Sequence, residues 1–260
     1  MDFKNELALL RPDLGSNVGA LFTERSGGVS SGPWGTVEGI MGLNVGSRVS
    51  DNAACVRMNR SIISQMTPSE PRWMTQVHGT RVVRAEEVAD ESVEADAQVT
   101  TVPGVVCTVQ VADCLPVLLA DDAGRGVAAV HAGWRSLAGG VIENAVKALR
   151  EAVGDDKARV RAWLGPRIGF DDFETGPEVA QAFQARYPRA KDAVRPVGEG
   201  KFLVSLAAFA KEALLDVGVT EVEDCGLSTV ADPVRFYSFR RDGQKTGRHA
   251  AMIWIKATSQ

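Results

Sequence analysis

The sequence predicts an α/β or α+β fold built around a mixed rather than purely parallel sheet. Strand-like and helix-like segments intermix without a regular strand–helix–strand rhythm. The chain has 260 residues, enough for a substantial core, and its 45% hydrophobic and 24% charged residues are ordinary for a globular protein. No repeat, low-complexity run or break in composition divides it. We therefore expect one domain over residues 1–260.

The N-terminal half predicts a strand, a long loop, a helix and a strand pair. A strand begins at Gly19 and continues as a Gly/Ser-rich loop to Gly46. A packing helix follows, with Asp51 as its expected N-cap. Its apolar residues have helical spacing: Ala54, Val56, Met58, Ile62, Ile63 and Met66. Residues 72–85 predict two strands around a tight turn at His78 and Gly79, and an acidic connection leads on to residues 97–101.

The rest of the chain predicts three central strands and then a mixture of elements. The strands are expected at 105–111, 117–120 and 127–130, with turns at Asp113–Cys114 and 122–126. The later elements are expected to be an amphipathic helix over 136–153, a strand entering a Gly-Pro turn over 159–169, a helix over 176–188 with Pro177 in its first turn, a helix over 201–219, and a hairpin over 236–256 with its turn at Asp242–Gly243.

Charge and composition exclude several function classes. The net charge is -4 and the pI about 5.5, with no block of Lys or Arg, so no nucleic-acid partner is expected. No apolar run approaches the roughly 20 residues of a membrane span, and "MDFKNELALLRPDLGS" is unlike a signal peptide, so we expect a cytoplasmic protein. The four cysteines are far apart and form no C-x-x-C pair, which favours free thiols: Cys55, Cys107, Cys114 and Cys225.

Three chemically versatile residues occur in similar local settings. His78 in "QVHGT", Cys114 in "VADCLP" and His131 in "AVHAGW" each follow an apolar strand and precede a small or turn-forming residue. Sites are commonly built at strand ends. Two imidazoles and one thiolate suit Zn²⁺, and three protein ligands leave a fourth position open. Alternatively, each residue is structural, or Cys114 is a nucleophile with a histidine as its base and Asp113 orienting that base. The spacing does not separate these interpretations.

The remaining candidates are weaker. Arg25, Arg48 and Arg135 could bind phosphate or carboxylate, although a surface or structural arginine is the favoured interpretation for each. Arg135 is the strongest because it lies just beyond His131. Trp134 is a candidate stacking wall or a core residue. The third histidine, His249, falls inside an expected strand and is interpreted as structural.

At these residues the sequence resembles the YfiH-like family. The resemblance rests on "FTERSGGVSSGPWG…GLNVG", "TQVHGTRVV", "ADCLPVLLAD", "VAAVHAGWRSLAGGVIE", "AWLGPRIG" and "FYSFRRDGQKTGRHAAMIWI", which follow in order from about Phe22 to Ile255. It implies a mixed β-sandwich core with flanking helices and a zinc site on His78, Cys114 and His131. The chain departs from the family pattern at Arg48 within "SRVSDN" and at three further positions: Ser136, Ser228 and His249.

Two activities have been assigned to the family that this sequence resembles. One is polyphenol oxidase or laccase, and the other is purine nucleoside phosphorylase. A multicopper laccase needs about ten histidines, because imidazole is the preferred copper ligand, and this chain has three. The second activity implies phosphorolysis of adenosine, inosine, guanosine or methylthioadenosine, with adenosine deamination beside it. The zinc-deaminase signature H-x-E…P-C-x-x-C is absent, so deamination needs another arrangement.

The resulting hypothesis is a zinc-dependent purine nucleoside enzyme that also binds phosphate. In it Asp113 moves a proton, Arg135 or Arg48 neutralises phosphate, and Gln76 and Asn44 contact purine or ribose. The resemblance also implies an alternative, a peptidoglycan-editing amide hydrolase that acts on UDP-MurNAc-L-Ser and depends on a thiol or on zinc. A third alternative is a non-enzymatic metal-binding partner protein. The sequence leaves the oligomeric state open, and a monomer is the working expectation.

Overall fold

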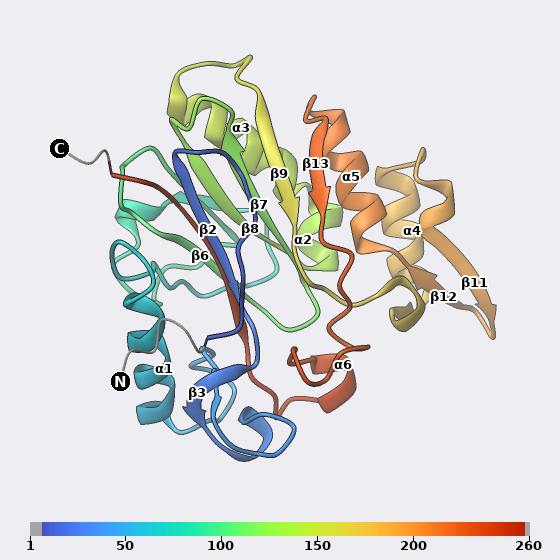
Figure 1. Ribbon diagram of the computed structural model, residues 1–260. Coiled ribbons are helices and arrows are strands. Elements are labelled where there is room, and N and C mark those ends of the chain that lie inside the picture. Colours follow the sequence, from blue (N-terminus) through green and yellow to red (C-terminus); the bar gives the residue numbers. More distant parts are fainter. Residues whose placement is uncertain (1–6, 258–260) are drawn as a thin grey trace.

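The computed structural model describes residues 7–257 as two facing β-sheets flanked by helices (Figure 1). The N-terminal stretch "MDFKNELALLRPDLGS", which was judged unlike a signal peptide, has its first six residues outside the described part of the chain. One sheet has the strand order β1-β2-β14-β6. Its strands are antiparallel and span β1 Leu9–Leu10, β2 Val18–Thr23, β14 His249–Ile255 and β6 Cys107–Val111.

The second sheet has six strands in the order β13-β9-β7-β8-β5-β4. Only its two edge pairs, β13–β9 and β4–β5, are parallel, so the sheet is mixed as predicted. Its strands are β4 Val82–Arg84, β5 Ala97–Thr100, β7 Leu115–Asp121, β8 Val127–Ala132, β9 Val160–Leu164 and β13 Glu221–Asp224. A peripheral sheet is formed by β10 Glu174–Thr175, β11 Val194–Gly198 and β12 Lys201–Val204. The short β3, Ser26–Ser30, adjoins the loop that follows it.

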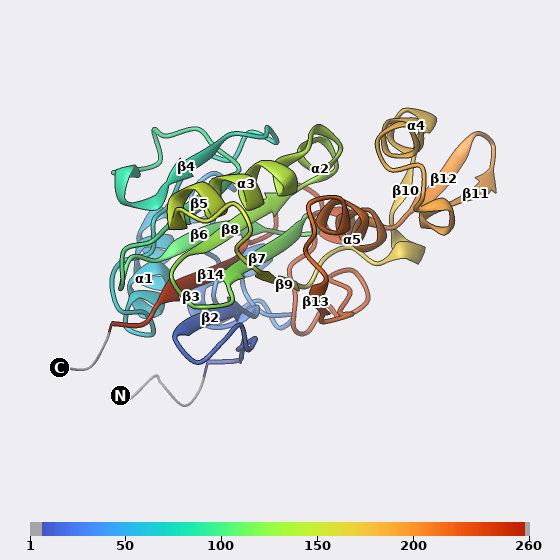
Figure 2. The ribbon, with the colours of Figure 1, turned by 90° about the horizontal axis from the view of Figure 1, so that it is seen from above.

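The alternation of side chains along each strand divides the core into layers. In β7, Val117 and Leu119 face a helical layer, whereas Leu118 and Ala120 pack between the two large sheets. Viewed from above, α3 and α5 lie over the outer face of the six-stranded sheet, and α1 lies on the other side of the molecule (Figure 2). The helices are α1 Ala53–Ser64, α2 Trp134–Gly139, α3 Val141–Val153, α4 Pro177–Arg186, α5 Leu206–Asp216 and α6 Phe239–Asp242. This arrangement confirms the mixed β-sandwich with flanking helices.

Several local predictions were wrong, each for an identifiable reason. The helix expected over 136–153 is two helices, because Gly140 has φ +96 and ends α2 before α3 begins. The helix expected over 201–219 contains strand β12 and then α5, which Ser205 caps by accepting a hydrogen bond from the Ala208 N–H. Asn52, rather than Asp51, caps α1.

The predicted C-terminal hairpin is absent from the structure. Residues at its first strand instead enter the short helix α6, where the Ser238 hydroxyl accepts from the Arg241 N–H. Residues 72–76, expected as a strand, make only isolated bridges, so β4 lacks the predicted hairpin partner. Among residues 7–257, no helix is both long and apolar enough to cross a bilayer.

Candidate metal centre and cavity

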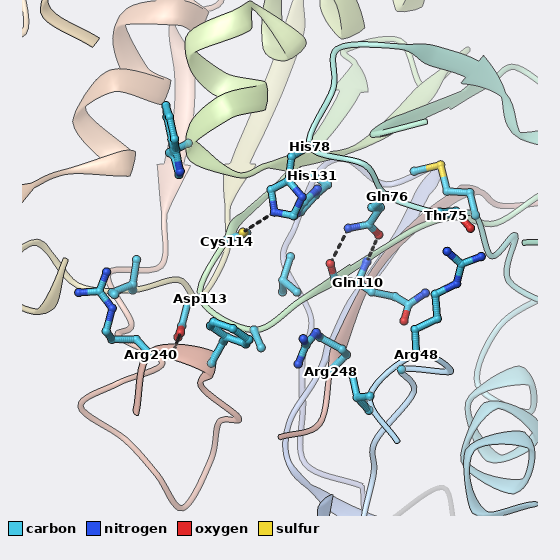
Figure 3. Close-up of a pocket in the computed structure, with 18 of the residues that line it drawn as sticks. Arg48, Thr75, Gln76, His78, Gln110, Asp113, Cys114, His131, Arg240 and Arg248 are labelled. Carbon is cyan, nitrogen blue, oxygen red and sulfur yellow. Dashed lines mark hydrogen bonds between the residues drawn. The ribbon is translucent and has the colours of Figure 1, made fainter. Parts of the chain in front are cut away.

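The three predicted ligands converge at one end of the sandwich, where β6 ends and β7 begins. Cys114 lies in the turn between these strands, His131 is the penultimate residue of β8, and His78 precedes β4. Their ligand atoms all lie within 4.8 Å of one another (Figure 3). The Cys114 sulfur is 3.8 Å from Nε2 of His78, and the two imidazole rings meet edge to face at 4.8 Å between centroids. The predicted cluster is therefore a real spatial cluster.

Asp96, a residue that the sequence reasoning missed, positions two of the three ligands. Its carboxylate accepts 2.8 Å from Nδ1 of His131, which turns Nε2 of that ring toward the cluster. The same carboxylate accepts from the backbone N–H groups of three consecutive residues, Val77, His78 and Gly79. His78 has φ +59, a left-handed conformation that is uncommon outside glycine. Asp96 therefore stabilises the strained turn that presents His78.

Asp113 performs the same task for Cys114. It too is left-handed, with φ +90, and it is buried. Its carboxylate accepts from the Thr229 hydroxyl at 2.5 Å, the Ser238 hydroxyl at 3.0 Å and the Arg240 N–H at 2.6 Å. Both oxygens are thus engaged by the chain itself, which favours a positioning role for Asp113 over the proton transfer expected from the sequence.

The electrostatics of the cluster favour a thiolate. Burial raises the pKa of the Cys114 thiol, but the neighbouring His131 imidazolium and hydrogen bonds from both histidines outweigh it, so the pKa falls below its ordinary value. Burial lowers the pKa of His131, but the Cys114 thiolate and the Asp96 carboxylate outweigh it, so that pKa rises. The negative sulfur is the form that binds metals.

The donor set fits zinc. Tetrahedral Zn²⁺ with Zn–N of about 2.0–2.1 Å and Zn–S of about 2.3 Å places two nitrogen ligands and one sulfur ligand roughly 3.3–3.6 Å apart. The observed sulfur–nitrogen separation of 3.8 Å and the 4.8 Å limit for the group need only a small closure to reach this. Three protein ligands with an orienting carboxylate behind one histidine is also the arrangement of open zinc sites.

Gly133 lies against His78 and Cys114, so its lack of a side chain leaves room for the cluster. A Cβ there would lie 2.7 Å from Cδ2 of His78 and 3.2 Å from the Cys114 sulfur. Gly133→Ala is expected to displace the His78 ring, to lower the free energy of unfolding by about 1–3 kcal/mol, and to weaken zinc binding. Denaturant unfolding and zinc content per chain measure both effects. Wild-type values for both would show that the cluster is less tightly packed against Gly133 than described.

The cluster lies in the wall of a cavity of about 510 Å³, within the size range of small-molecule sites. Three aromatic residues, Trp134, Phe173 and Phe239, line it together with the apolar Met74, Ile168 and Leu206. Phe239 is an exposed aromatic side chain. Opposite polar groups come from the 46–49 loop and from β6. The cavity therefore combines aromatic and apolar walls with the His–Cys–His cluster.

The structure brings some predicted substrate-binding residues into this cavity. Arg48, Gln76 and Trp134 all line it. The Gln76 side chain exchanges two hydrogen bonds of 2.7 Å with the backbone of Gln110, so it is held in place by β6 (Figure 3). The Gln110 side chain also lines the cavity, and among the described residues its amide has no hydrogen-bond partner.

Two predicted residues are not in the cavity. Asn44 is fully buried, and its amide bonds Asp51, the backbone of Gly46 and the Arg248 N–H. Its amide is thus occupied by structural contacts, and Asn44 does not line the cavity. Arg135 is exposed, with its guanidinium 4.4 Å from the Trp134 ring centroid, and it does not line the cavity. Their expected contacts with substrate or phosphate stay predictions, which this placement outside the cavity does not support.

Other cavity residues were missed by the sequence reasoning. Phe239, Arg240 and Arg248 line the cavity and come from the segment that was predicted as a plain hairpin. The signal in the sequence that could have identified them is the resemblance of this segment, "FYSFRRDGQKTGRHAAMIWI", to the family. His249, next in the chain, is structural as expected: burial lowers its pKa to about 3, and its Nε2 accepts from the Tyr237 N–H.

Comparison with known proteins places this geometry in a family. Residues 19–256 match the sequence family described as multi-copper polyphenol oxidoreductase laccase. A Pseudomonas aeruginosa protein named purine nucleoside phosphorylase is 41% identical, over 96% of this chain and 99% of its own. The Escherichia coli (strain K12) purine nucleoside phosphorylase YfiH is 39% identical, over 92% and 94%.

Solved structures agree with the fold. The crystal structure of a Neisseria meningitidis protein matches with a TM-score of 0.86 and 41% identity, covering 96% of this chain and 99% of that one. The Bacillus licheniformis hypothetical protein YfiH matches with the same TM-score, 0.86, at 26% identity, covering 97% of this chain and 100% of that one. The resemblance drawn from the motifs is confirmed.

Proposed function

The chain belongs to the family described as multi-copper polyphenol oxidoreductase laccase, and from that premise we propose that it is a zinc-dependent purine nucleoside phosphorylase. The names of its full-length relatives support the activity. The observation that carries the proposal is the convergence of His78, Cys114 and His131 in the wall of a cavity large enough for a nucleoside.

The number of histidines available as metal ligands argues against a multicopper oxidase activity. The chain has three histidines, and His249 is buried in the core with its Nε2 bonded to a backbone N–H. Two histidines and one cysteine remain for the cavity. A multicopper cluster takes about ten imidazoles, so the residues here do not suffice. One metal ion with a mixed nitrogen and sulfur donor set matches them better.

The proposed reaction breaks the bond between ribose C1′ and the purine nitrogen. A phosphate oxygen forms the new bond to C1′, the bonding electrons leave with the purine, and a proton completes the free base beside ribose 1-phosphate. Trp134 and Phe239 supply ring surfaces for the purine, and the Gln110 amide supplies a donor and an acceptor for its edge or for ribose hydroxyls. When bound, zinc supplies Lewis-acid polarisation of a substrate oxygen.

Adenosine deamination is proposed as an accompanying activity. Water replaces the amino group at purine C6, giving inosine and ammonia. A three-residue donor set that opens onto a purine-sized cavity supports it, because such sites leave a coordination position for a small ligand. Since both Asp113 oxygens are engaged, the proton carrier is another group or solvent.

A substrate screen tests the proposal. Purified zinc-loaded protein is incubated with adenosine, inosine, guanosine or methylthioadenosine, with and without phosphate, and products are separated by chromatography. We expect phosphate-dependent release of free base and pentose 1-phosphate, with phosphate-independent conversion of adenosine to inosine. A parallel incubation contains UDP-MurNAc-L-Ser. Turnover of that compound, with all four nucleosides unchanged at every zinc loading, would contradict the proposal and favour the amide hydrolase.

A further inference from the structure

Three arginines reach the cavity, and their surroundings differ. The Arg240 guanidinium donates to the backbone carbonyls of Asp172 and Glu174, so it is engaged by the chain itself. Arg48 is exposed and lies near enough to Glu91 to help lower the pKa of that carboxyl. Arg248 is half-buried and, within residues 7–257, has no carboxylate within ion-pair distance. Figure 3 shows Arg48 and Arg248 pointing into different parts of the cavity.

The fold holds Arg248 in place from several directions. Its backbone N–H donates 2.8 Å to Oδ1 of Asn44. Its Nη1 donates to the carbonyls of Thr246 and Gly247 at 3.2 and 3.0 Å. A Cβ on Gly46 would lie 2.8 Å from Cγ of Arg248, so the glycine leaves room for the stem. These contacts fix the side chain and leave Nε and Nη2 without an acceptor among the described residues.

Such a guanidinium is suited to an anion. Carbonyl acceptors satisfy one of its nitrogens but leave its positive charge uncompensated. Burial lowers the pKa of Arg248, which reflects the cost of keeping this cation away from water. The nearest acids are already engaged, since Asp113 accepts three hydrogen bonds. An oxyanion with two oxygens matches the free edge of the fork and offsets this cost.

We infer that Arg248 forms the phosphate-binding subsite of this cavity, positioned by Asn44 and Gly46. The inference rests on the proposed function for the identity of the anion as phosphate. It replaces Arg135, which lies outside the cavity, and it gives Asn44 a role through Arg248 rather than through contact with substrate. The phosphate oxyanion comes either from inorganic phosphate or from a phosphorylated nucleoside.

Direct binding measurements test the inference without requiring turnover. Inorganic phosphate and, separately, adenosine 5′-monophosphate are titrated calorimetrically into zinc-loaded wild-type protein and variants. We expect Arg248→Gln to weaken phosphate binding at least about tenfold, the loss of one charge-assisted pair, and Arg248→Lys to weaken it less. Arg57→Gln, on the exposed face of α1, is the matched control and should bind phosphate as the wild type does.

Two checks make the result interpretable. Zinc content and the unfolding midpoint of each variant establish that it is folded. If Arg248→Gln does not fold, Arg248→Lys, which keeps the aliphatic stem and the charge, takes its place in the comparison. Arg248-dependent binding of either probe supports the subsite, and the probe that binds identifies the source of the phosphate. Unchanged affinity in folded Arg248→Gln, or a loss caused instead by Arg135→Gln, overturns it.

The outcome is distinguishable from failure of the proposed function. If no nucleoside is cleaved but phosphate binds in an Arg248-dependent way, the subsite stands and the reaction assignment fails. If nucleosides are cleaved, the KM for phosphate should rise in Arg248→Gln by the same factor as the binding constant, whereas the KM for the nucleoside changes little. Cleavage with an unchanged KM for phosphate overturns the subsite and leaves the reaction assignment intact.

Discussion

Replacing Cys114 with serine is expected to abolish zinc binding and to lower nucleoside phosphorolysis by more than about 100-fold. A neutral hydroxyl is a far weaker zinc ligand than the thiolate that His131 and His78 stabilise. Even orienting partners behind a metal ligand cost 10–100-fold when removed, so loss of the ligand itself should cost more. Elemental analysis for zinc and chromatography of the products measure the two effects in the same samples.

The matched control is Cys55→Ser. Cys55 is also half-buried, but it lies on α1 outside the cavity, so zinc content and activity should match the wild type. The same pair of variants separates the two roles proposed for Cys114. If Cys114→Ser keeps one zinc per chain while activity disappears, the sulfur is a nucleophile and its assignment as a ligand is wrong.

Replacing Asp96 with asparagine should give the second-largest effect. The amide nitrogen of asparagine cannot accept, so it leaves two donors unpaired: either the Val77 and Gly79 N–H groups, or the His78 N–H and Nδ1 of His131. We expect zinc affinity to fall about 10–100-fold and the free energy of unfolding to fall by about 1–3 kcal/mol. Competition against a chromophoric chelator measures the affinity independently of turnover.

An exposed carboxylate provides the comparison for Asp96. Asp156 lies in the turn after α3, and its side chain has no hydrogen-bond or ion-pair partner among residues 7–257, so Asp156→Asn should leave both quantities unchanged. Wild-type zinc affinity in a folded Asp96→Asn protein would mean that the turn and the His131 ring hold their positions without the carboxylate.

The cluster of His78, Cys114 and His131 could be predicted because its signal is local. Each of the three residues follows an apolar segment and precedes a small or turn-forming residue. Ends of neighbouring strands lie close together at the edge of a sheet, so such residues can form one site. The carboxylates and the arginine that complete the site act across long distances in sequence. Asp96 is 35 residues from His131, and Asn44 is 204 residues from Arg248. Neither pairing leaves a pattern within a short window of sequence.

The mistakes in secondary structure have related causes. The dipeptide Asp242–Gly243 was interpreted as a hairpin turn, but a serine cap makes the preceding residues helical and Gly243 ends that turn with φ +75. Because residues 239–242 are helical, Phe239 and Arg248 both line the cavity instead of lying on paired strands. Apolar runs such as 201–219 carry too little periodicity to separate a buried strand from a buried helix, and the capping Ser205 was the informative residue.

The central claim is that a metal on His78, Cys114 and His131 serves purine nucleoside phosphorolysis. Its most direct test is a zinc titration of chelator-treated protein, with ribose 1-phosphate formed from inosine and phosphate measured at each step. We predict negligible product without zinc and a linear rise that saturates at one zinc per chain. Full activity in the zinc-free protein, or no ribose 1-phosphate at any zinc loading, would contradict it.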